Sequence, residues 1–473
     1  MNVLLVAPPI DMDSAKLSPC ALPIGLLQLA AVLREAGHVP TLLDLATVKI
    51  PEGIEPEDYR RALLCASIRE LDPGYVGINC LTSMNFPQVR RLIYDIHVEA
   101  PDIPICLGGI HPTWYYREIF EHCPEVDYIV LGEGETQTVA LANAIASGDR
   151  YALQGVQSLA YRNADGALVV HPRTSYIDDL DALPLPAYDL LDFTDYHRDL
   201  SRWYNPKNHT IKTLTPLFTS RSCPFNCSFC MGHIMTGRGY REKSPDKVVD
   251  EIEILTREFG QNYFAILDEN SILNKDRFIA ICNDISKRGL DIQLSAVSGF
   301  YLNAVDEDIV KAYKKAGGIS VSIPIESGSS YIRNTVINKN LSDETIINAV
   351  RLFKKYDLFT IGFFIMGFEE DTPSTLDESI AMMERLQLDI NNTANLSPYP
   401  GTKIFARAKQ NGTLLIDDNQ TWNGEVLFAQ RSEMRFFIKP PGLSMDELRR
   451  YRAVFNQYFL YSDRVRHEAR GSR

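Results

Sequence analysis

Three cysteines lie within eight residues of one another near the middle of the chain, at Cys223, Cys227 and Cys230. A 4Fe–4S cluster has four irons that are normally held by four thiolates, and three thiols on one short loop can bind three of them. No other cysteine is close in sequence, so the fourth iron is expected to stay open for a substrate. A structural zinc site is the alternative, with His233 as the nearby candidate for its fourth ligand.

The residues around this triplet predict a barrel. From about residue 214, strand patterns alternate with amphipathic helix patterns through six βα units. This succession indicates a partial (β/α)6 barrel of the TIM type, whose active site lies at the carboxyl ends of the strands. The triplet directly follows the first strand, so its thiols are expected at that face. The strands are expected at 216–221, 263–267, 293–297, 320–325, 360–366 and 392–396, and the helices are expected to begin near Pro245, Lys275, Asp306, Ser342 and Pro373.

The spacing Cys-x-x-x-Cys-x-x-Cys, with the aromatic Phe229 before the last cysteine, resembles the radical S-adenosylmethionine superfamily. The resemblance covers about residues 214–405. It implies a 4Fe–4S cluster on the three cysteines with Phe229 beside it, S-adenosylmethionine (SAM) as the cosubstrate, and an electron donor such as flavodoxin or ferredoxin. Further matching motifs follow the later strands, at 267–270, 325–329, 365–370 and 398–402.

The same resemblance implies cofactor-binding roles for residues at the strand ends. Asp268 and Glu269 lie where the family places backbone contacts to the methionyl amine of SAM. Glu326 and Ser327 are expected near the ribose, and Gly367 is expected to back the adenine. Glycines at strand ends are also ordinary turn residues, and Glu326 could instead be a solvent-facing helix cap.

The implied reaction starts at the open iron. The amine and carboxylate of the methionine chelate this iron, and one electron from the cluster breaks a carbon–sulfur bond, which gives methionine and a 5′-deoxyadenosyl radical. The radical then abstracts a hydrogen atom from an unactivated carbon. The protein orients the reactants and excludes water and oxygen.

The first 150 residues predict a separate α/β domain. Five short apolar strands alternate with amphipathic helices, which indicates a parallel, doubly wound, Rossmann-like sheet. Such a sheet binds ligands beyond the carboxyl ends of its strands. The strands are expected at 3–7, 41–45, 75–80, 103–107 and 127–131.

This domain resembles the cobalamin-binding domain that is fused to many radical SAM enzymes. The matching residues are Pro8-Pro9 after the first strand, followed by 23–30, 36–38, 108–113 and 132–135. The alternative is a degenerate domain that only supports the barrel. The resemblance implies cobalamin binding by the strand-end residues Ser83, Gly108, Gly109, Gly132, Glu133 and Gly134.

One departure from the pattern concerns the cobalt ligand. Many cobalamin proteins carry an Asp-x-His-x-x-Gly motif whose histidine binds cobalt from below, and this sequence lacks the motif. His38 and His111 stand in other contexts, and the expected role of His111 is that of a locally hydrogen-bonded loop residue. A bound cobalamin is therefore expected to lack a protein nitrogen on its lower face.

The remaining segments are less regular. Residues 151–210 predict a linker with a hairpin at 158–170, which could pack on either neighbouring domain. The barrel is expected to span 211–408. The C-terminal segment, 409–473, contains an expected helix at 445–461.

The bulk composition argues against several classes of protein. A net charge of −13 argues against a general nucleic-acid binder, and the chain has no run of about 18 apolar residues that would predict a membrane span. The N-terminus lacks the basic region of a secretory signal, so we expect a cytoplasmic protein. The other cysteines are expected to be reduced and buried; they are Cys20, Cys65, Cys80, Cys106, Cys123 and Cys282.

Together, the two resemblances predict a cobalamin-dependent radical SAM methyltransferase that acts on an unactivated carbon, or on phosphorus, of a small molecule. One alternative is an oxidative cyclase or another radical rearrangement enzyme with an auxiliary or structural cobalamin domain. The alternative from another class is a zinc-binding scaffold or regulatory protein. No motif identifies the substrate; Arg241, Trp203 and Tyr240 flank the triplet and either reach the substrate or face solvent.

Replacing Cys227 with alanine is expected to abolish the cluster and the activity together, because the variant lacks one of the three thiolates. The iron–sulfur absorbance and the turnover of the reconstituted variant test this prediction. A variant that keeps both at full level would remove Cys227 from the ligand set.

Overall fold

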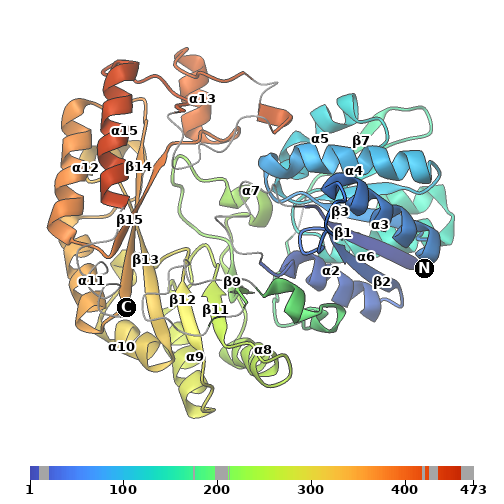
Figure 1. The fold of residues 1–473 in the computed structure, drawn as a ribbon, viewed down its shortest axis with the longest axis horizontal. Helices are drawn as coiled ribbons and strands as arrows, with labels where there is room; N and C mark the ends of the chain where they lie inside the picture. The colour runs from blue at the N-terminus through green and yellow to red at the C-terminus, as the bar shows by residue number, and fades with distance from the viewer. Residues whose placement is uncertain are drawn as a thin grey trace. The chain divides into compact units, whose positions relative to one another are not determined.

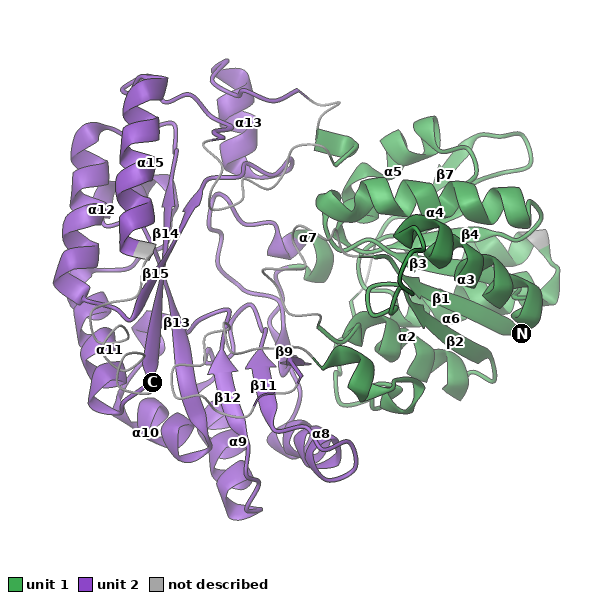
Figure 2. Ribbon diagram, in the orientation of Figure 1, with its two compact units in different colours: residues 1–198, 234–237, 418–425 green, residues 199–233, 238–417, 426–473 purple. Residues whose placement is uncertain are grey.

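The computed structural model of the chain describes residues 1–9, 21–173, 176–197, 211, 213–417, 421–424 and 435–459. The chain divides into two compact units, which Figure 2 shows in different colours. The N-terminal unit comprises residues 1–198, 234–237 and 418–425, and the barrel unit comprises residues 199–233, 238–417 and 426–473. None of the helices in the described ranges is long and apolar enough to cross a membrane.

The N-terminal unit is built on a seven-stranded sheet with the order β2-β1-β3-β4-β5-β6-β7. The pairs from β2 to β5 are parallel, and the predicted hairpin, β6 and β7, extends the sheet in antiparallel fashion. The chain runs from β1 to β2 on one side and returns to β3 on the other, so the topological switch point lies between β1 and β3. The strands are β1 (Asn2–Ala7), β2 (Val39–Asp44), β3 (Tyr75–Asn79), β4 (Ile105–Gly108), β5 (Tyr128–Val130), β6 (Leu159–Arg162) and β7 (Leu168–Val170).

Helices cover both faces of this sheet (Figure 1). Alternate residues of β1 enter two separate cores, because successive side chains of a strand point to opposite faces. Leu4 and Val6 pack with α3, α4 and α5, whereas Val3 and Leu5 pack with α2 and α6. The prediction of a doubly wound sheet is confirmed. The helices are α2 (Ile24–Glu35), α3 (Pro56–Leu71), α4 (Phe86–Glu99), α5 (Ile110–His122) and α6 (Glu135–Ser147).

Two of these helices, α3 and α5, were not predicted from the sequence. Helix α3 is mostly polar and buries only three of its residues, so its apolar stripe is too short to recognise. Helix α5 begins at Ile110, inside a segment that the sequence analysis treats as a loop. The turn before it needs Gly109, which has a φ of +110° and whose added Cβ would lie 2.4 Å from Cys80 O.

The barrel unit is built on a six-stranded parallel sheet with the order β15-β14-β13-β12-β11-β8 (Figure 1). The prediction of six βα units is therefore confirmed. The first expected strand, 216–221, is wrong in extent, because the chain leaves β8 after Leu217 and forms a separate short strand, β9, that pairs with β10. The strands are β8 (Thr215–Leu217), β9 (Ser220–Arg221), β10 (Arg241–Glu242), β11 (Tyr263–Ile266), β12 (Gln293–Ala296), β13 (Gly318–Glu326), β14 (Phe359–Met366) and β15 (Ile390–Asn395).

Side-chain caps define where the barrel helices begin. A Ser, Asn, Asp or Thr side chain accepts the N-terminal backbone hydrogen bond of α8, α9, α10, α11, α12 and α13. The five predicted helix starts agree with these positions. The helices are α7 (Gly232–Thr236), α8 (Pro245–Arg257), α9 (Lys275–Lys287), α10 (Glu307–Lys315), α11 (Asp343–Lys355), α12 (Pro373–Leu386), α13 (Lys403–Gln410) and α15 (Met445–Phe459).

Candidate functional site

The cysteine triplet lies on the loop that follows β9, beyond the carboxyl end of the first barrel strand. Cys223 and Cys227 are half-buried and Cys230 is exposed. Ser222, just before the first cysteine, is buried and has a φ of +73°, a conformation that is strained for a residue other than glycine. Its N–H donates to Glu269 Oε2 over 3.0 Å. Glu269, which the resemblance places near the methionyl amine of SAM, therefore holds the start of the loop.

Two segments that are distant in sequence hold the middle of the loop. Ser228 N donates to Ile337 O over 2.9 Å, and Ser228 Oγ donates to Val336 O over 2.7 Å. Ser228 O accepts a hydrogen bond from Ile404 N in α13 over 3.2 Å. Phe229, predicted to lie beside the cluster, packs with Cys227 against an apolar cluster built partly from these two segments. The backbone of the cysteine loop is thus fixed from two directions.

An ion pair lies near the cysteine loop, at the end of β13. Glu326 ends this strand with a φ of +68° and a side chain that is 9% exposed, and Lys339 Nζ lies 2.8 Å from its Oε1. Burial raises the pKa of the Cys227 thiol to about 11, whereas the Lys339 ammonium acts to lower the pKa of both Cys227 and Cys223. Glu326 is therefore not the solvent-facing helix cap of the alternative interpretation.

The sequence analysis does not identify Lys339. This residue lies in a turn where both neighbours are strained, with φ values of +66° at Asn338 and +53° at Asn340. Asparagine adopts this conformation more readily than most residues. The tripeptide Asn-Lys-Asn is therefore the signal that could have indicated a displayed lysine.

The side chain of Asp268 supports the first strand. It is buried, and its carboxylate accepts hydrogen bonds from Thr219 N (2.6 Å), Thr219 Oγ1 and Ser220 Oγ (2.7 Å). These bonds explain why β8 ends early, since Thr219 N bonds to a side chain. Burial raises the pKa of Asp268. Any contact of Asp268 with SAM must come from its backbone, as the resemblance implies.

A buried carboxylate also shapes the turn at Gly367. Gly367 has a φ of +94°, and its N–H and that of Phe368 donate to Asp371 Oδ2 over 2.7 and 3.0 Å. Asp371 Oδ1 accepts a hydrogen bond from Thr375 Oγ1 in the first turn of α12. The turn that is expected to back the adenine is therefore held from beneath by Asp371.

The residues flanking the triplet have separate environments. Tyr240 OH donates to Asn270 O over 3.1 Å, so the loop after β11 positions it. Arg241 belongs to β10, and its Nε donates to Gly239 O over 3.3 Å. Trp203 lies outside the described residues.

The donor set fits an iron–sulfur cluster. Three thiols on one loop at the carboxyl end of a barrel strand are the ligands that such a cluster uses. Among the described residues, no three His, Cys, Asp or Glu side chains stand close enough together to hold a single metal ion.

Part of the predicted cobalamin site lies together beyond β3 and β4. Cys80 N donates to Gly108 O over 2.8 Å, and Ser83 Oγ lies 2.9 Å from His111 Nδ1. A Cβ added to Gly108 would meet no atom within 4 Å, so a ligand can approach this backbone closely. These strand ends adjoin the switch point of the sheet, where doubly wound folds bind ligands. The residues therefore fit a bulky cofactor at this edge.

His111 lies in the first turn of α5 and not in a loop. Its ring is 1% exposed and lies between Phe86 and Tyr115, with centroid distances of 4.3 and 4.9 Å. Burial lowers the pKa of His111 to about 3, so the imidazole is neutral near pH 7. Its Nε2 has no hydrogen-bond partner among the described residues.

The second group of predicted cobalamin residues is covered by the chain itself. Gly132 N donates to Thr113 Oγ1 over 2.9 Å, and a Cβ on Gly132 would lie 2.7 Å from Arg173 Nη1. Glu133 Oε2 accepts a hydrogen bond from Ile177 N over 3.0 Å. Gly134 packs close to the side chain of Leu29. In this structure the Gly132 amide therefore already has a partner within the chain, and a role for it in cobalamin binding stays a prediction.

Comparison with known proteins agrees with the family resemblances of both the barrel unit and the N-terminal unit. The chain matches the Radical SAM superfamily over residues 217–383 and the B12 binding domain over residues 12–142. It is 32% identical over 418 residues to an uncharacterized methyltransferase of Pyrococcus horikoshii, which covers 88% of this chain and 84% of that protein. The chain belongs to the radical SAM enzymes that carry a cobalamin-binding domain. A 4Fe–4S cluster, SAM and cobalamin are the cofactors of this family.

Other members of the family have different reactions. The chain is 31% identical over 409 residues to the anaerobic magnesium-protoporphyrin IX monomethyl ester cyclase of Rubrivivax gelatinosus, which covers 86% of this chain and 69% of that protein. The fold is similar to that of the radical SAM methyltransferase TsrM from Kitasatospora setae, with a TM-score of 0.74 and 18% identity over 97% of this chain and 89% of that chain. The TsrM structure contains cobalamin and a [4Fe-4S] cluster.

The buried His111 predicts a pH dependence of stability. Its pKa in the folded protein lies below the usual value, so its contribution to stability is present above about pH 6.5 and is lost as the pH falls toward 3. Between pH 7 and pH 5 the free energy of unfolding should fall by about 2 kcal/mol more in the wild type than in His111→Gln.

Urea unfolding of the full chain at the two pH values measures this difference. His97→Gln, which replaces an exposed histidine on α4, is the matched control and should behave as the wild type. An identical pH dependence in wild type and His111→Gln would show that His111 is not held neutral.

Proposed function

We propose that the enzyme is a cobalamin-dependent radical SAM methyltransferase that acts on an unactivated carbon, or on phosphorus, of a small molecule. The observation that carries the proposal is the cysteine loop at the carboxyl end of the barrel, fixed by two distant segments, in a chain that also has a cobalamin-binding domain. The 32% identity to a protein named as a methyltransferase supports methyl transfer.

We assign the cluster to Cys223, Cys227 and Cys230. The cluster, when bound, supplies the electron that cleaves SAM. Glu326 and Lys339 lie close to this loop with opposite charges, so they offer both a hydrogen-bond acceptor and a cation to a polar cosubstrate. The strained backbones at Ser222 and Glu326 support this assignment, because strain is retained mainly where function requires a particular geometry.

We assign cobalamin to the edge of the N-terminal sheet that carries Ser83, Gly108 and Gly109. The open backbone at Gly108 admits a bulky ligand, and the Ser83–His111 hydrogen bond holds the loop after β3 against α5. We leave Gly132 and Glu133 out of this assignment, because their polar groups already have partners within the chain.

A second function within the same chemistry is oxidative cyclisation without methyl transfer. The 31% identity to the magnesium-protoporphyrin IX monomethyl ester cyclase supports it. The cysteine loop and the Glu326–Lys339 pair serve both reactions equally, because both begin with cleavage of SAM. The two reactions differ in their products.

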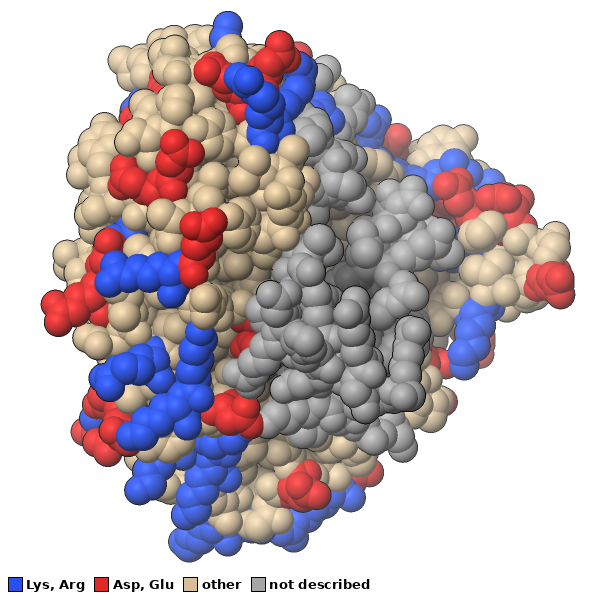
Figure 3. All heavy atoms as spheres, turned by 60° about the vertical axis from the view of Figure 1, so that its left-hand side comes forward, with Lys and Arg blue, Asp and Glu red and all other residues tan. Residues whose placement is uncertain are grey.

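The partners follow from the chemistry. One-electron reduction of the cluster calls for a donor such as flavodoxin or ferredoxin. On the face drawn in Figure 3, basic side chains are interspersed with acidic ones. Ion pairs of the barrel unit such as Lys355–Glu307 and Arg288–Asp250 neutralise basic charge, which does not favour nucleic acid as a partner. The cysteines of the described residues are free, which fits a reducing compartment such as the cytoplasm.

Methyl transfer predicts a pair of SAM-derived products. Under anaerobic conditions with reductant, hydroxocobalamin and substrate candidates, the full chain should release 5′-deoxyadenosine and S-adenosylhomocysteine together. Liquid chromatography with mass detection measures both products. Release of 5′-deoxyadenosine with no S-adenosylhomocysteine would favour the cyclase, and release of neither from a cluster-loaded enzyme would contradict both functions.

A further inference from the structure

Residues 326–339 join Glu326 to Lys339. This segment folds around the buried guanidinium of Arg333. We propose that Arg333 is a positioning residue that sets Glu326 and Lys339 against the cysteine loop and thereby sustains SAM binding. This inference rests on the proposed function, because it gives the Glu326–Lys339 pair a role in holding SAM.

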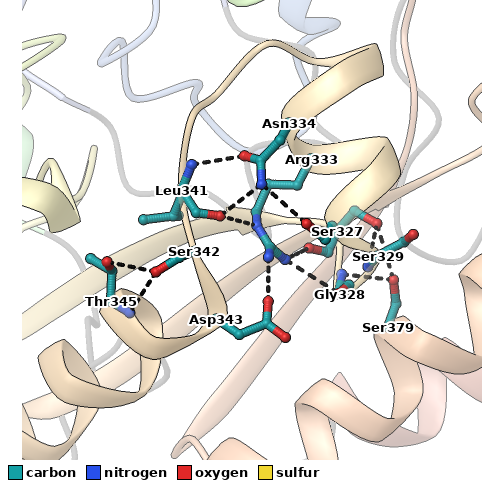
Figure 4. A network of polar contacts seen from close by, with 11 residues as sticks. Ser327, Gly328, Ser329, Arg333, Asn334, Leu341, Ser342, Asp343, Thr345 and Ser379 are labelled. Carbon is teal, nitrogen blue, oxygen red and sulfur yellow. Dashed lines mark hydrogen bonds and ion pairs between the residues drawn. The ribbon is translucent and has the colours of Figure 1, made fainter.

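Arg333 uses its planar fork to join three parts of this segment (Figure 4). Its side chain is 0% exposed. Nη1 donates to Ser327 O over 2.8 Å and to Gly328 O over 3.3 Å, which are the two residues that follow Glu326. Nε donates to Leu341 O over 2.7 Å, two residues beyond Lys339. One side chain therefore connects the chain just after Glu326 with the chain just after Lys339.

The turn after Glu326 is also held from its other side. Gly328 N donates to Ser379 Oγ of α12 over 2.9 Å, and a Cβ on Gly328 would lie 2.4 Å from Glu378 O (Figure 4). The turn is thus pressed against α12 while Arg333 binds its carbonyl groups. A non-glycine residue at a φ of +68° persists only where its surroundings over-determine it, and these contacts supply that constraint for Glu326.

The backbone around Arg333 reaches the cysteine loop directly. Arg333 O accepts a hydrogen bond from Lys339 N over 3.0 Å, which sets the start of the strained Lys339 turn. Val336 O and Ile337 O, a few residues further along, accept the two hydrogen bonds of Ser228. A displacement of Arg333 would therefore move Glu326, Lys339 and the carbonyl groups that bind Ser228 together.

The charge of Arg333 has one carboxylate partner, Asp343, at the N-terminus of α11. The Asp343 side chain is 47% exposed, so replacing it leaves fewer buried polar groups without a partner than replacing Arg333 does. A lysine at position 333 would keep the charge but could not donate to three separated acceptors in one plane. Arg333→Lys therefore keeps the positive charge but loses the hydrogen bonds that hold the segment in place. Asp343→Asn removes the ion pair of the same guanidinium at its exposed partner.

A control exists on the outer helices. Arg288 is likewise a guanidinium with several partners, but they are the carboxylates of Asp250, Glu253 and Asp284 on α8 and α9. Arg288→Lys makes the same substitution at a guanidinium whose ion pairs join α8 and α9, with partners outside the segment between Glu326 and Lys339. If loss of such a network acts only through general stability, the two lysine variants should behave alike.

The experiment uses the full chain with a reconstituted cluster and SAM as the probe. SAM binding is followed by the change in the electron paramagnetic resonance spectrum of the reduced cluster, and the Km and kcat for formation of 5′-deoxyadenosine are measured separately. Arg333→Lys is expected to keep the iron–sulfur absorbance and to raise the dissociation constant and the Km for SAM about tenfold or more, with a smaller change in kcat. Asp343→Asn is expected to raise both about threefold, and Arg288→Lys is expected to bind SAM as the wild type does.

The inference is overturned if folded, cluster-loaded Arg333→Lys binds SAM with wild-type affinity, or if Arg288→Lys loses affinity to the same extent. Should Arg333→Lys fail to fold, Asp343→Asn decides: a wild-type dissociation constant overturns the inference, and a rise of about threefold supports it. A wild-type enzyme that has its cluster but does not cleave SAM would instead defeat the proposed function, which separates the two failures.

Discussion

The proposed function depends on a loop that presents three thiols, those of Cys223, Cys227 and Cys230, to one metal cluster. Such a loop must be held by its backbone, because its side chains are reserved for iron. The structure provides this support through Ser222, which bonds to the end of the neighbouring strand, and through Ser228, which bonds to segments more than 100 residues away in sequence. The strain at Ser222 is tolerated because its hydrogen bond to Glu269 leaves the backbone little freedom.

The barrel unit places two charged side chains near the cysteine loop, and both have little exposure to water. Glu326 and Lys339 are both largely buried, and a buried ion pair is stable only if further hydrogen bonds fix its geometry. The contacts of Arg333, Ser379 and the turn at Lys339 meet that requirement. The site is therefore built from one short segment after β13 together with the loop after β9. This arrangement explains how a sheet with only six strands supports a precise active site.

The sequence predicts the parts of this site that are local. The cysteine spacing, the six βα units and the doubly wound sheet are visible as patterns along the chain, and each is confirmed by the fold or by the family match. Lys339 and Arg333 were not predicted, because their roles arise from contacts that the folded chain creates. The approach of Arg173 to Gly132 was not predicted for the same reason, since Arg173 comes from a segment about 40 residues further along. Helix α5 was missed because a glycine at its start resembles a loop signal.

The two units carry different features. The barrel unit has the cysteine triplet, and the N-terminal unit has a buried, neutral His111 and an open backbone at Gly108. Relatives with similar identity to this chain are named as a methyltransferase and as a cyclase. Overall identity at this level therefore does not distinguish the two products.

The central claim is that one iron of the cluster has no protein ligand and is bound by the methionyl group of SAM. Electron–nuclear double resonance of the reduced, full-length enzyme with SAM that carries ¹⁵N at its amine tests this claim most directly. The account predicts a ¹⁵N coupling of the size expected for an amine bound to iron. The absence of that coupling, together with a signal from a fourth protein side chain on the cluster, would contradict it.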